Sequence, residues 1–332
     1  MEKKYDVYGI GNALVDMEFE VSDAFFHQHQ IEKGIMTLVD EERQNYLMSN
    51  INQYEVKKQC GGSAANSIIG VSQFGGKCYY SCKVANDSLG EFYFQDLKRS
   101  KVDTNLNPEN LPEGVTGKCL VMVTPDAERT MNTFLGITSD LSINEIDEES
   151  LKASKYIYIE GYLISSPEGL KAMMEVRRLA SKHGINTCLT LSDPSMVKYF
   201  KDGLKEVIGD GLDLLFCNQE EALMFTGSNN LSVARDKLKE LAATFVITRG
   251  KDGALVFDGT TFIDIKPFPV QAVDTNGAGD MFAGAFLYGL THGHGYAHSG
   301  KIASLASSKV VNKFGPRLDW HQAKEILNHL FA

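Results

Sequence analysis

The chain of 332 residues is long enough for one large α/β domain with an appendage, or for two ordinary domains. Hydrophobic residues make up 43% of it and charged residues 23%, a composition that excludes a mainly disordered chain. The formal net charge is −10, and no long block of Lys and Arg interrupts this acidic balance. Nucleic acid and membrane surfaces are therefore not expected partners, because both reward clustered positive charge.

In chain order, short β-rich stretches alternate with helical stretches. The first strand is expected over Tyr5–Ile10, and a helix over Ser63–Phe74 is followed by two glycines that stop it. The alternation continues with strands over Cys78–Ala85, Tyr156–Ile159, Asn186–Leu191, Leu212–Phe216 and Phe245–Thr248, and with helices over Leu89–Lys101, Pro167–His183 and after Thr275. This pattern predicts a three-layer α/β fold in which helices cover both faces of a mostly parallel sheet.

Two segments in the N-terminal half break the alternation. Lys118–Leu135 contains two strand-like runs around a Pro-Asp turn, which predicts a β-hairpin. Met17–Val21 and Ile35–Val39 are further short β-like pieces. Together they predict a small β appendage that is built from two insertions into the larger domain.

The lack of a recognisable targeting signal predicts a cytoplasmic location. No signal-peptide core can be drawn near the N-terminus, and the most apolar run, Met281–Leu290, is about half of the ~20 residues that a membrane span needs. The six cysteines stand singly, with no C-x-x-C pair, so we expect buried free thiols. Three histidines at 292, 294 and 298 follow a helix end among glycines, and we assign them no metal.

The strongest motif is Asp-Thr-Asn-Gly-Ala-Gly-Asp at residues 274–280, just before an apolar helix. Small residues at 277–279 let backbone N–H groups converge at the helix N-terminus, where they favour an anion such as a transferring phosphoryl group. Asp280 falls in the first turn beside this anion site and is our candidate for the base that deprotonates an attacking hydroxyl. The alternative is that Asp280 only caps a helix after an ordinary glycine loop. The aspartates at both ends of the motif, Asp274 and Asp280, favour a functional role instead.

A second glycine motif, Gly-Gly-Ser-Ala-Ala-Asn-Ser, occupies residues 61–67 and also opens a helix. Its glycines permit close backbone approach to a ligand, and Asn66 offers both a donor and an acceptor, which would suit a polyol. A routine loop with a Ser N-cap is an equally good explanation of this motif alone.

Two other nucleotide-binding motifs are not found. The chain has no P-loop sequence, which excludes a P-loop kinase. Leu14 stands in place of the third glycine of a dinucleotide-binding fingerprint, which disfavours NAD binding.

Together these motifs resemble the two signatures of the ribokinase-like (PfkB) kinases. Gly11–Asp16 matches the position where the first strand of this family delivers an Asp to sugar hydroxyls. Asn218–Glu221 is similar to the family's Asn-x-x-Glu motif, and Thr248–Gly253 to its nucleotide-side strand and turn. The resemblance spans nearly the whole chain and implies a ribokinase-like fold.

That fold implies two parts. A large nucleotide-binding and catalytic domain is expected over residues 1–15, 60–104 and 139–332, and a small discontinuous β lid over residues 16–59 and 105–138. Family members can pair through lid strands, because an exposed sheet edge invites pairing. A monomer and a lid-mediated homodimer both remain open.

Within the family, the likeness is strongest to the adenosine kinase branch. It is carried by Gly11–Asp16, Gly61–Ser67, Glu128–Thr130, Glu160–Leu163 and Asn276. Ribokinases proper usually show Gly-Gly-Lys-Gly-Ala-Asn in place of the Gly-Gly-Ser-Ala-Ala-Asn found here, which favours a nucleoside over a free sugar. Met36 lies near the place where adenosine kinases can put a base-contacting Gln, and it offers no polar handle for a purine edge.

The resemblance implies transfer of the γ-phosphoryl group of ATP to the 5′-hydroxyl of a nucleoside, with adenosine the favoured acceptor and purine salvage the setting. Asp280 would be the base, and the amides of Gly277, Ala278 and Gly279 would stabilise the phosphoryl group. The resemblance further implies Mg²⁺ in a network with Glu221, and a monovalent cation such as K⁺ near Asp274. The implied substrate-binding residues are Asn12, Leu14, Asp16, Met36, Leu38, Gly61, Gly62, Asn66, Arg129 and Tyr162. The implied ATP-binding residues are Asn218, Thr248, Gly250, Gly253, Thr275, Gly277, Gly279 and Gly315.

Two other functions stay open. A sugar kinase of the same family would act on ribose, fructose or a phosphorylated sugar, and a phosphorylated sugar would call for extra cations in the lid. The lid segments offer Lys33, Arg43, Lys118 and Arg129, and Arg129 is equally well explained as a plain cation at the hairpin tip. A non-catalytic nucleoside-binding protein is disfavoured, because Asp280 and its glycines are intact.

Overall fold

The larger of two β-sheets forms the middle layer of the molecule. The computed structural model describes residues 3–51, 57–126 and 128–331. Among these residues, nine strands form this sheet in the order β14-β13-β12-β11-β10-β9-β1-β5-β6, and the seven from β12 to β6 are parallel. The strands are β1 (Tyr5–Ile10), β5 (Cys78–Ser81), β6 (Val102–Thr104), β9 (Ser154–Glu160), β10 (Asn186–Thr190), β11 (Leu212–Asn218), β12 (Ala242–Thr248), β13 (Ala254–Phe257) and β14 (Phe262–Ile265).

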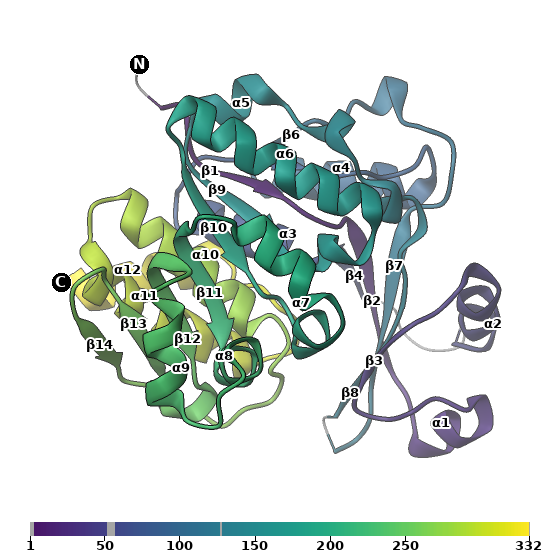
Figure 1. Ribbon diagram of the computed structural model, residues 1–332. Coiled ribbons are helices and arrows are strands. Elements are labelled where there is room, and N and C mark those ends of the chain that lie inside the picture. Colours follow the sequence, from purple (N-terminus) through teal and green to yellow (C-terminus); the bar gives the residue numbers. More distant parts are fainter. Residues whose placement is uncertain (1–2, 52–56, 127, 332) are drawn as a thin grey trace.

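Helices cover both faces of this sheet (Figure 1), so the predicted three-layer α/β fold is confirmed. One hydrophobic core lies on the side of α3, α10 and α11, and the other on the side of α6 and α7. The helices of the first side are α3 (Ser63–Gln73), α4 (Ser88–Arg99), α10 (Ala278–Thr291), α11 (Gly295–Val311) and α12 (Trp320–Phe331). Those of the second side are α5 (Glu148–Lys152), α6 (Pro167–His183), α7 (Pro194–Ile208), α8 (Gln219–Thr226) and α9 (Leu231–Leu238).

Local sequence signals explain where these elements begin and end. Helix α6 has the predicted bounds: the Ser166 hydroxyl accepts from the Gly169 N–H at its start, and Gly184 adopts the left-handed conformation at its end. The strand predicted over Cys78–Ala85 is too long, because β5 ends at Ser81. The side chain of Asn105 binds both the N–H and the carbonyl of Cys82 and so replaces a strand partner there.

A second, smaller sheet projects from the large body (Figure 1). Its five described strands run in the order β3-β8-β7-β2-β4, and β7 and β8 pair antiparallel, which confirms the predicted hairpin. Helices α1 (Asp23–His29) and α2 (Glu41–Ile51) flank its outer part. The strands are β2 (Leu14–Glu20), β3 (Met36–Leu38), β4 (Lys57–Gly61), β7 (Gly117–Val123) and β8 (Arg129–Phe134).

The two sheets meet at the glycine loops. The chain passes from β1 through Gly11–Ala13 into β2, and from β4 through Gly62 into α3. Short 3₁₀ turns complete the fold at η1 (Pro108–Asn110), η2 (Gly136–Asp140), η3 (Ile143–Glu145), η4 (Gly161–Ser165) and η5 (Gly250–Asp252). Because β1 and its parallel neighbours end at this junction, their carboxyl ends open onto it, as is usual for ligand sites in parallel sheets.

Candidate active site

The loop at residues 274–280 is shaped by one obligatory glycine. Gly277 has φ +71° and stands at the N-terminus of α10, and a Cβ atom built on it would lie 2.2 Å from the Cβ of Pro316. A left-handed conformation and a contact this close both require glycine. The Asp274 carboxylate holds the start of the loop, because it accepts from the N–H groups of Asn276 and Gly315, each at 2.9 Å.

This loop leaves N–H groups available to a ligand. In the described part of the chain, no acceptor is bound to the N–H of Gly277 or to that of Gly279. A Cβ atom on Gly279 would meet nothing within 4 Å, so the backbone faces open space there. Unpaired N–H groups at the N-terminus of a helix attract an anion, and a phosphoryl group fits this description.

Asp280 lies in the first turn of α10 and faces helix α3. The Ser63 hydroxyl donates to its Oδ1 at 2.7 Å, and the Asn66 amide donates to its Oδ2 at 3.2 Å. Burial raises the pKa of Asp280 to about 6, and the two hydrogen bonds act against this rise. The carboxylate is therefore ionised at neutral pH but basic enough to accept a proton from a hydroxyl.

Asp16 is the second carboxylate of the site. It lies on β2 against Gly61, where an added Cβ would come within 2.1 Å of its Oδ1. Among the described residues, no group donates a hydrogen bond to it, although its side chain is partly buried. Burial raises the pKa of Asp16 to about 7; the positive charges of Arg317 and Arg129 act against this rise, and Asp280 adds to it. A partly buried carboxyl group without donors is suited to bind the hydroxyl groups of a ligand.

We expect turnover to fall as the pH is lowered through about 7 to 6. Asp16 and Asp280 both have raised pKa values, so each is ionised above that range and becomes protonated within it. Only the ionised form of Asp280 can accept a proton. A profile of kcat/KM against pH between 5 and 9 should therefore show an acid limb in this range. An acid limb near pH 4 would contradict the burial of these two groups.

The loop between β1 and β2, at Gly11–Ala13, is held by the buried carboxylate of Glu160, for which the sequence motifs predict no such role. Oε1 of Glu160, at the end of β9, accepts from the N–H and from the side-chain amide of Asn12, at 3.2 and 2.8 Å. Its Oε2 accepts from the N–H of Ala64 at 2.8 Å. Burial raises the pKa of Glu160 to about 7, and these hydrogen bonds oppose the rise. Glu160 therefore clamps the β1–β2 loop to the start of α3.

Gly62 completes this clamp. It has φ +97°, and a Cβ atom on it would come within 2.2 Å of the carbonyl oxygen of Asn12. The predicted residues Asn12, Asp16, Gly61, Gly62 and Asn66 thus gather on one side of Asp280.

Arg129 reaches the site from the hairpin. The structure places it at the start of β8 in ion pairs with Glu18 at 3.3 Å and with Asp274 at 2.5 Å, and its side chain is only 9% exposed. It is therefore not a free cation at a hairpin tip, but a bridge from the second sheet to the loop at residues 274–280. The Asp274 carboxylate already binds Arg129 and two N–H groups, so the structure does not support the monovalent cation that the resemblance implies beside it.

A cavity of about 530 Å³ opens on the other side of the loop. Of the predicted ATP-binding residues, Thr248, Gly250, Gly253, Thr275 and Gly279 line it, whereas Asn218, Gly277 and Gly315 do not. Several of its residues were not predicted: Lys251, Pro267, Phe268, Pro269, Val270, Ala272, Phe282, Ser304, Ser307, Ser308 and Val311. Apart from Lys251, which lies inside the Thr248–Gly253 stretch, no motif marks them. The prolines and apolar residues at 267–272 indicate a rigid apolar wall. The volume and the mostly apolar lining suit a nucleotide base and ribose.

Asn218 and Glu221 have a local structural role. They form a capping box at the start of α8, in which the Asn218 N–H donates to Glu221 at 2.9 Å and the Glu221 N–H donates to Asn218 at 2.8 Å. Burial raises the pKa of Glu221 to about 7, and the nearby charge of Asp193 contributes. The described residues contain no group of three His, Cys, Asp or Glu side chains that could hold a metal ion. Glu221 and Asp193 alone do not make a metal site, so a Mg²⁺ ion beside them would have to be brought by a nucleotide.

The apolar residues predicted around a base are dispersed. Leu14 lies beside Asp16 on β2, but Met36 and Leu38 lie on β3 at the opposite edge of the second sheet, and Leu38 is 53% exposed. Tyr162 is close enough to Asp280, Glu160 and Glu221 for their charges to add to the rise in its pKa that burial causes. The structure therefore brings Leu14 and Tyr162 to the site, and does not bring Met36 and Leu38 there.

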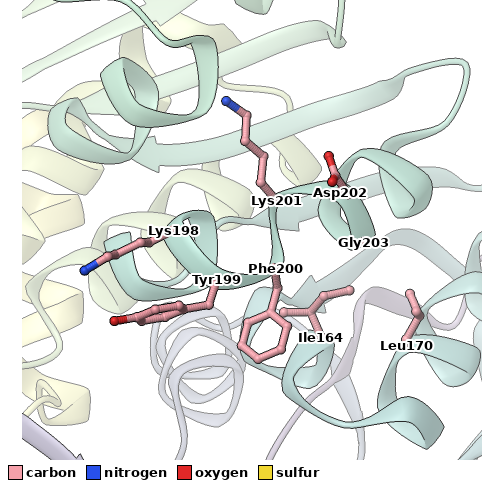
Figure 2. A pocket seen from close by; sticks show the side chains of 8 residues that line it. All are labelled: Ile164, Leu170, Lys198, Tyr199, Phe200, Lys201, Asp202 and Gly203. Atoms are coloured by element: carbon pink, nitrogen blue, oxygen red, sulfur yellow. The ribbon is translucent and has the colours of Figure 1, made fainter.

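A smaller cavity of about 300 Å³ lies apart from this site, between η4 and the kink of α7 at Phe200. Figure 2 shows that the side chains of Lys198 and Lys201 extend away from each other there. Lys201 donates to the carbonyl of Met224, so the two cations do not form a binding pair.

Other expectations concern the rest of the chain. All six cysteines are buried and free, as predicted. His292 binds the carbonyl of Tyr288 at 3.0 Å and stacks on its ring, which is consistent with a helix-end role. In the part of the chain that the structure describes, each helix is too short or too polar to cross a bilayer.

A buried carboxylate in the first turn of a helix, unpaired amides next to it and a nucleotide-sized cavity indicate a class of enzyme. They are the parts of a phosphotransferase that acts on hydroxyl groups, in which catalysis depends on positioning and electrostatic stabilisation. The family comparison agrees: residues 34–323 match the pfkB family carbohydrate kinases. The chain belongs to this family, whose members phosphorylate hydroxyl groups of sugars or nucleosides.

Similar proteins include both nucleoside and sugar kinases. The chain is similar to the adenosine kinase of Saccharomyces cerevisiae, with 26% identity over 92% of this chain and 95% of the relative. It is similar to a 5-dehydro-2-deoxygluconokinase of Clostridium perfringens, with 25% identity over 93% of this chain and 88% of the relative. Among solved structures, adenosine kinase from Sinorhizobium meliloti is 33% identical with a TM-score of 0.90, covering 98% of this chain and 99% of that one. A probable sugar kinase from Rhizobium etli is 31% identical with a TM-score of 0.89, covering 99% and 100%.

Proposed function

We propose that this kinase transfers the γ-phosphoryl group of ATP to the 5′-hydroxyl of a nucleoside, and that adenosine is the favoured acceptor. The observation that carries the proposal is Asp16, a partly buried carboxyl group without a described donor, which lies in the same site as Asp280. Such a group can bind the two adjacent hydroxyls of a ribose and leave the 5′-hydroxyl pointing toward Asp280. The product would be AMP, which returns the nucleoside to the purine nucleotide pool of the cytoplasm.

Three of the four lid cations named from the sequence, all but Lys118, are engaged by other groups of the protein. Lys33 is paired with Asp23 and Asp126, Arg129 with Glu18 and Asp274, and Arg43 donates to the carbonyl of His29. A phosphorylated sugar would need unpaired cations near Asp16, because a buried phosphate must be neutralised. These partners disfavour that substrate but are compatible with a nucleoside or a free sugar.

In the proposed mechanism, Asn12, Asp16, Gly62 and Asn66 hold the ribose, and Leu14 and Tyr162 contact the base. Asp280 accepts the proton of the 5′-hydroxyl as its oxygen attacks the γ-phosphorus. The N–H groups of Gly277 and Gly279 stabilise the charge on the transferring group. Mg²⁺, when bound to the nucleotide, would neutralise phosphate oxygens, and Glu221 with Asp193 would hold it through water.

We propose that residues 16–59 and 105–138 act as the lid of this site. The second sheet, its two helices and the Arg129 bridge all belong to these segments or border them. Closure of such a lid would exclude water and suppress hydrolysis of ATP. A lid-mediated homodimer and a monomer are both compatible with this role.

A panel of acceptors tests the proposed substrate. Release of ADP from ATP should be measured with adenosine, inosine, guanosine, cytidine, ribose, fructose and fructose phosphates as acceptors. We expect the highest kcat/KM with adenosine. The sugar kinase is the second candidate, because a diol-binding Asp16 also fits a free sugar and a sugar kinase is among the similar structures. Strong turnover of a free sugar with none of any nucleoside would establish that second candidate instead.

A further inference from the structure

One buried cation, Arg317, joins the elements around the acceptor site. It lies between α11 and α12, directly after Gly315 and Pro316, and its side chain is only 11% exposed. All three of its side-chain nitrogens have acceptors. Nε donates to Oδ1 of Asn66 at 3.3 Å, Nη1 donates to Oδ2 of Asp96 at 2.9 Å, and Nη2 donates to the carbonyl of Cys60.

These contacts fix the orientation of the Asn66 amide. A guanidinium group can only donate hydrogen bonds, so the atom of Asn66 that faces Arg317 must be its oxygen. The NH₂ group then faces the opposite way, toward Oδ2 of Asp280 at 3.2 Å. If the amide were flipped, its NH₂ would oppose the guanidinium and its oxygen would oppose the Asp280 carboxylate, which is unfavourable on both sides.

Asp96 holds Arg317 in place. Its Oδ2 accepts from Arg317 and from the N–H of Cys60, the latter at 3.0 Å. Burial would raise the pKa of Asp96, but the charge of Arg317 and the Cys60 N–H outweigh burial and lower it. Asp96 is thus a stable anion that anchors the guanidinium to α4 and to the end of β4.

The same segment supports the phosphoryl-binding loop. The N–H of Gly315 donates to Asp274, and Pro316 packs against Gly277 at a distance that excludes any side chain there. Residues 315–317 therefore contact both glycine loops, the one at 274–280 through Gly315 and Pro316 and the one at 61–67 through Arg317. No other described contact joins the two loops through a cation.

We propose that Arg317 is a positioning residue for phosphoryl transfer: it orients the Asn66 amide so that its N–H side binds Asp280, and thereby keeps Asp280 ionised and correctly placed. The inference rests on the proposed role of Asp280 as the base. It adds a residue that touches neither the acceptor nor the nucleotide in the mechanism above.

The charged groups around Asp280 do not favour its ionised form, so its hydrogen bonds must do so. The titratable groups whose charges interact with it are Asp16 on β2, Tyr158 and Glu160 on β9, and Tyr162 on η4. Each of these is neutral or negative, so none of them favours the ionised form of Asp280. Arg317 and Arg129 are cations of this region, and after burial the charge of Arg317 has the largest effect on the pKa of Asp16. The ionised state of Asp280 therefore depends on the hydrogen bonds from Ser63 and Asn66.

The variants Arg317→Gln and Arg317→Lys test the proposal. Both remove the planar three-acceptor arrangement, and the Lys variant keeps the charge and is the safer one for folding. The pKa of Asp280 should be measured by NMR on the free enzyme with ¹³C-labelled Asp carboxyl groups, with Asp280→Asn used to assign the signal. We expect it to rise by about 0.5–1 unit in both variants, the size expected for loss of one hydrogen bond to a carboxylate.

Kinetics supply the second readout. The acid limb of the kcat profile should move to higher pH by the same amount, so the loss of kcat should be several-fold greater at pH 6 than at pH 8. In an Asn66→Ala background, Arg317→Lys should cause no further shift, because Arg317 acts through Asn66. The control is Arg177→Lys, because Arg177 also donates to main-chain carbonyls but lies on α6, on the opposite face of the large sheet from α10. It should lower stability without moving the acid limb.

The outcomes separate this inference from the proposed function. An unchanged Asp280 pKa and acid limb in both Arg317 variants, with activity lost equally at every pH, would overturn the positioning role and leave only a structural one. Near-normal turnover of Asp280→Asn would instead overturn the base, whatever the NMR experiment shows. Because the NMR readout uses the free enzyme, it does not depend on which acceptor is phosphorylated.

Discussion

Asp280→Asn is expected to lower kcat by about 10²–10⁴-fold, the range that a general base contributes. The amide cannot accept a proton, whereas its oxygen can still accept from the Ser63 hydroxyl, which lies 2.7 Å from Oδ1. The fold and the binding of both substrates should therefore persist. Initial rates of ADP release give kcat, and calorimetry gives the affinity for the acceptor.

Ser63→Ala is the matched control for this prediction. It removes one of the two hydrogen bonds to Asp280 but leaves the carboxylate in place. We expect a loss of about tenfold or less at pH 8, as for the loss of one hydrogen bond. A variant Asp280→Asn with near-normal kcat and normal affinity would mean that another group accepts the proton.

Gly277→Ala is expected to lower kcat by about 10²-fold or more, the cost of displacing a donor from a site that stabilises developing charge. An added Cβ would lie 2.2 Å from the Cβ and 2.6 Å from the Cα of Pro316, and the residue would keep an unfavourable φ of +71°. The start of α10 must move to relieve this contact, and the unpaired N–H groups move with it. The measurement is kcat together with the free energy of unfolding.

Gly184→Ala is the control that separates backbone strain from displacement of the phosphoryl-binding loop in Gly277→Ala. Gly184 also has a left-handed φ of +62°, at the end of α6, but a Cβ atom there would meet nothing within 4 Å. We expect it to lose about 1–2 kcal/mol of stability from backbone strain, with kcat unchanged. Equal loss of kcat in both variants would show that stability, and not the shape of the phosphoryl-binding loop, explains the effect.

Much of the fold could be predicted from the sequence, because its signals are local. The bounds of β1 and α6 were predicted correctly, since an unbroken apolar strand and a helix with a Ser-Pro start and a Gly end carry their own signals. The β7–β8 hairpin was predicted from its Pro-Asp turn. The strand after Cys78 was predicted too long, because the Asn105 side chain that ends it lies 23 residues away from Cys82.

The site was predictable only where a motif marks it. Asp280, Asn66 and the glycines of both loops stand in short motifs whose chemistry is evident from residue type. Arg317, Asp96 and Glu160 act through contacts that join residues far apart in the sequence, such as Arg317 and Asn66, which are 251 positions apart. The apolar wall at residues 267–272 lacked a motif as well, because shape and not chemistry places it beside the cavity.

The acidic balance of the chain finds an explanation at the site. Under the proposed function, a protein of net charge −10 would bind an anionic nucleotide through local features. The N–H groups of Gly277 and Gly279, the N-terminus of α10 and Lys251 at the cavity supply the positive potential. Arg129 and Arg317 are instead neutralised by carboxylates and organise the site.

The central claim, transfer to a nucleoside 5′-hydroxyl, is tested most directly by identifying the product. The enzyme should be incubated with ATP, Mg²⁺ and adenosine, and the products should be analysed by ³¹P NMR and mass spectrometry. The account predicts AMP with its phosphate on the 5′-oxygen, formed in equal amount to ADP, and formed about 10²-fold or more slowly with Asp280→Asn. Formation of ADP without AMP, together with a phosphorylated free sugar when ribose or fructose is supplied, would contradict it.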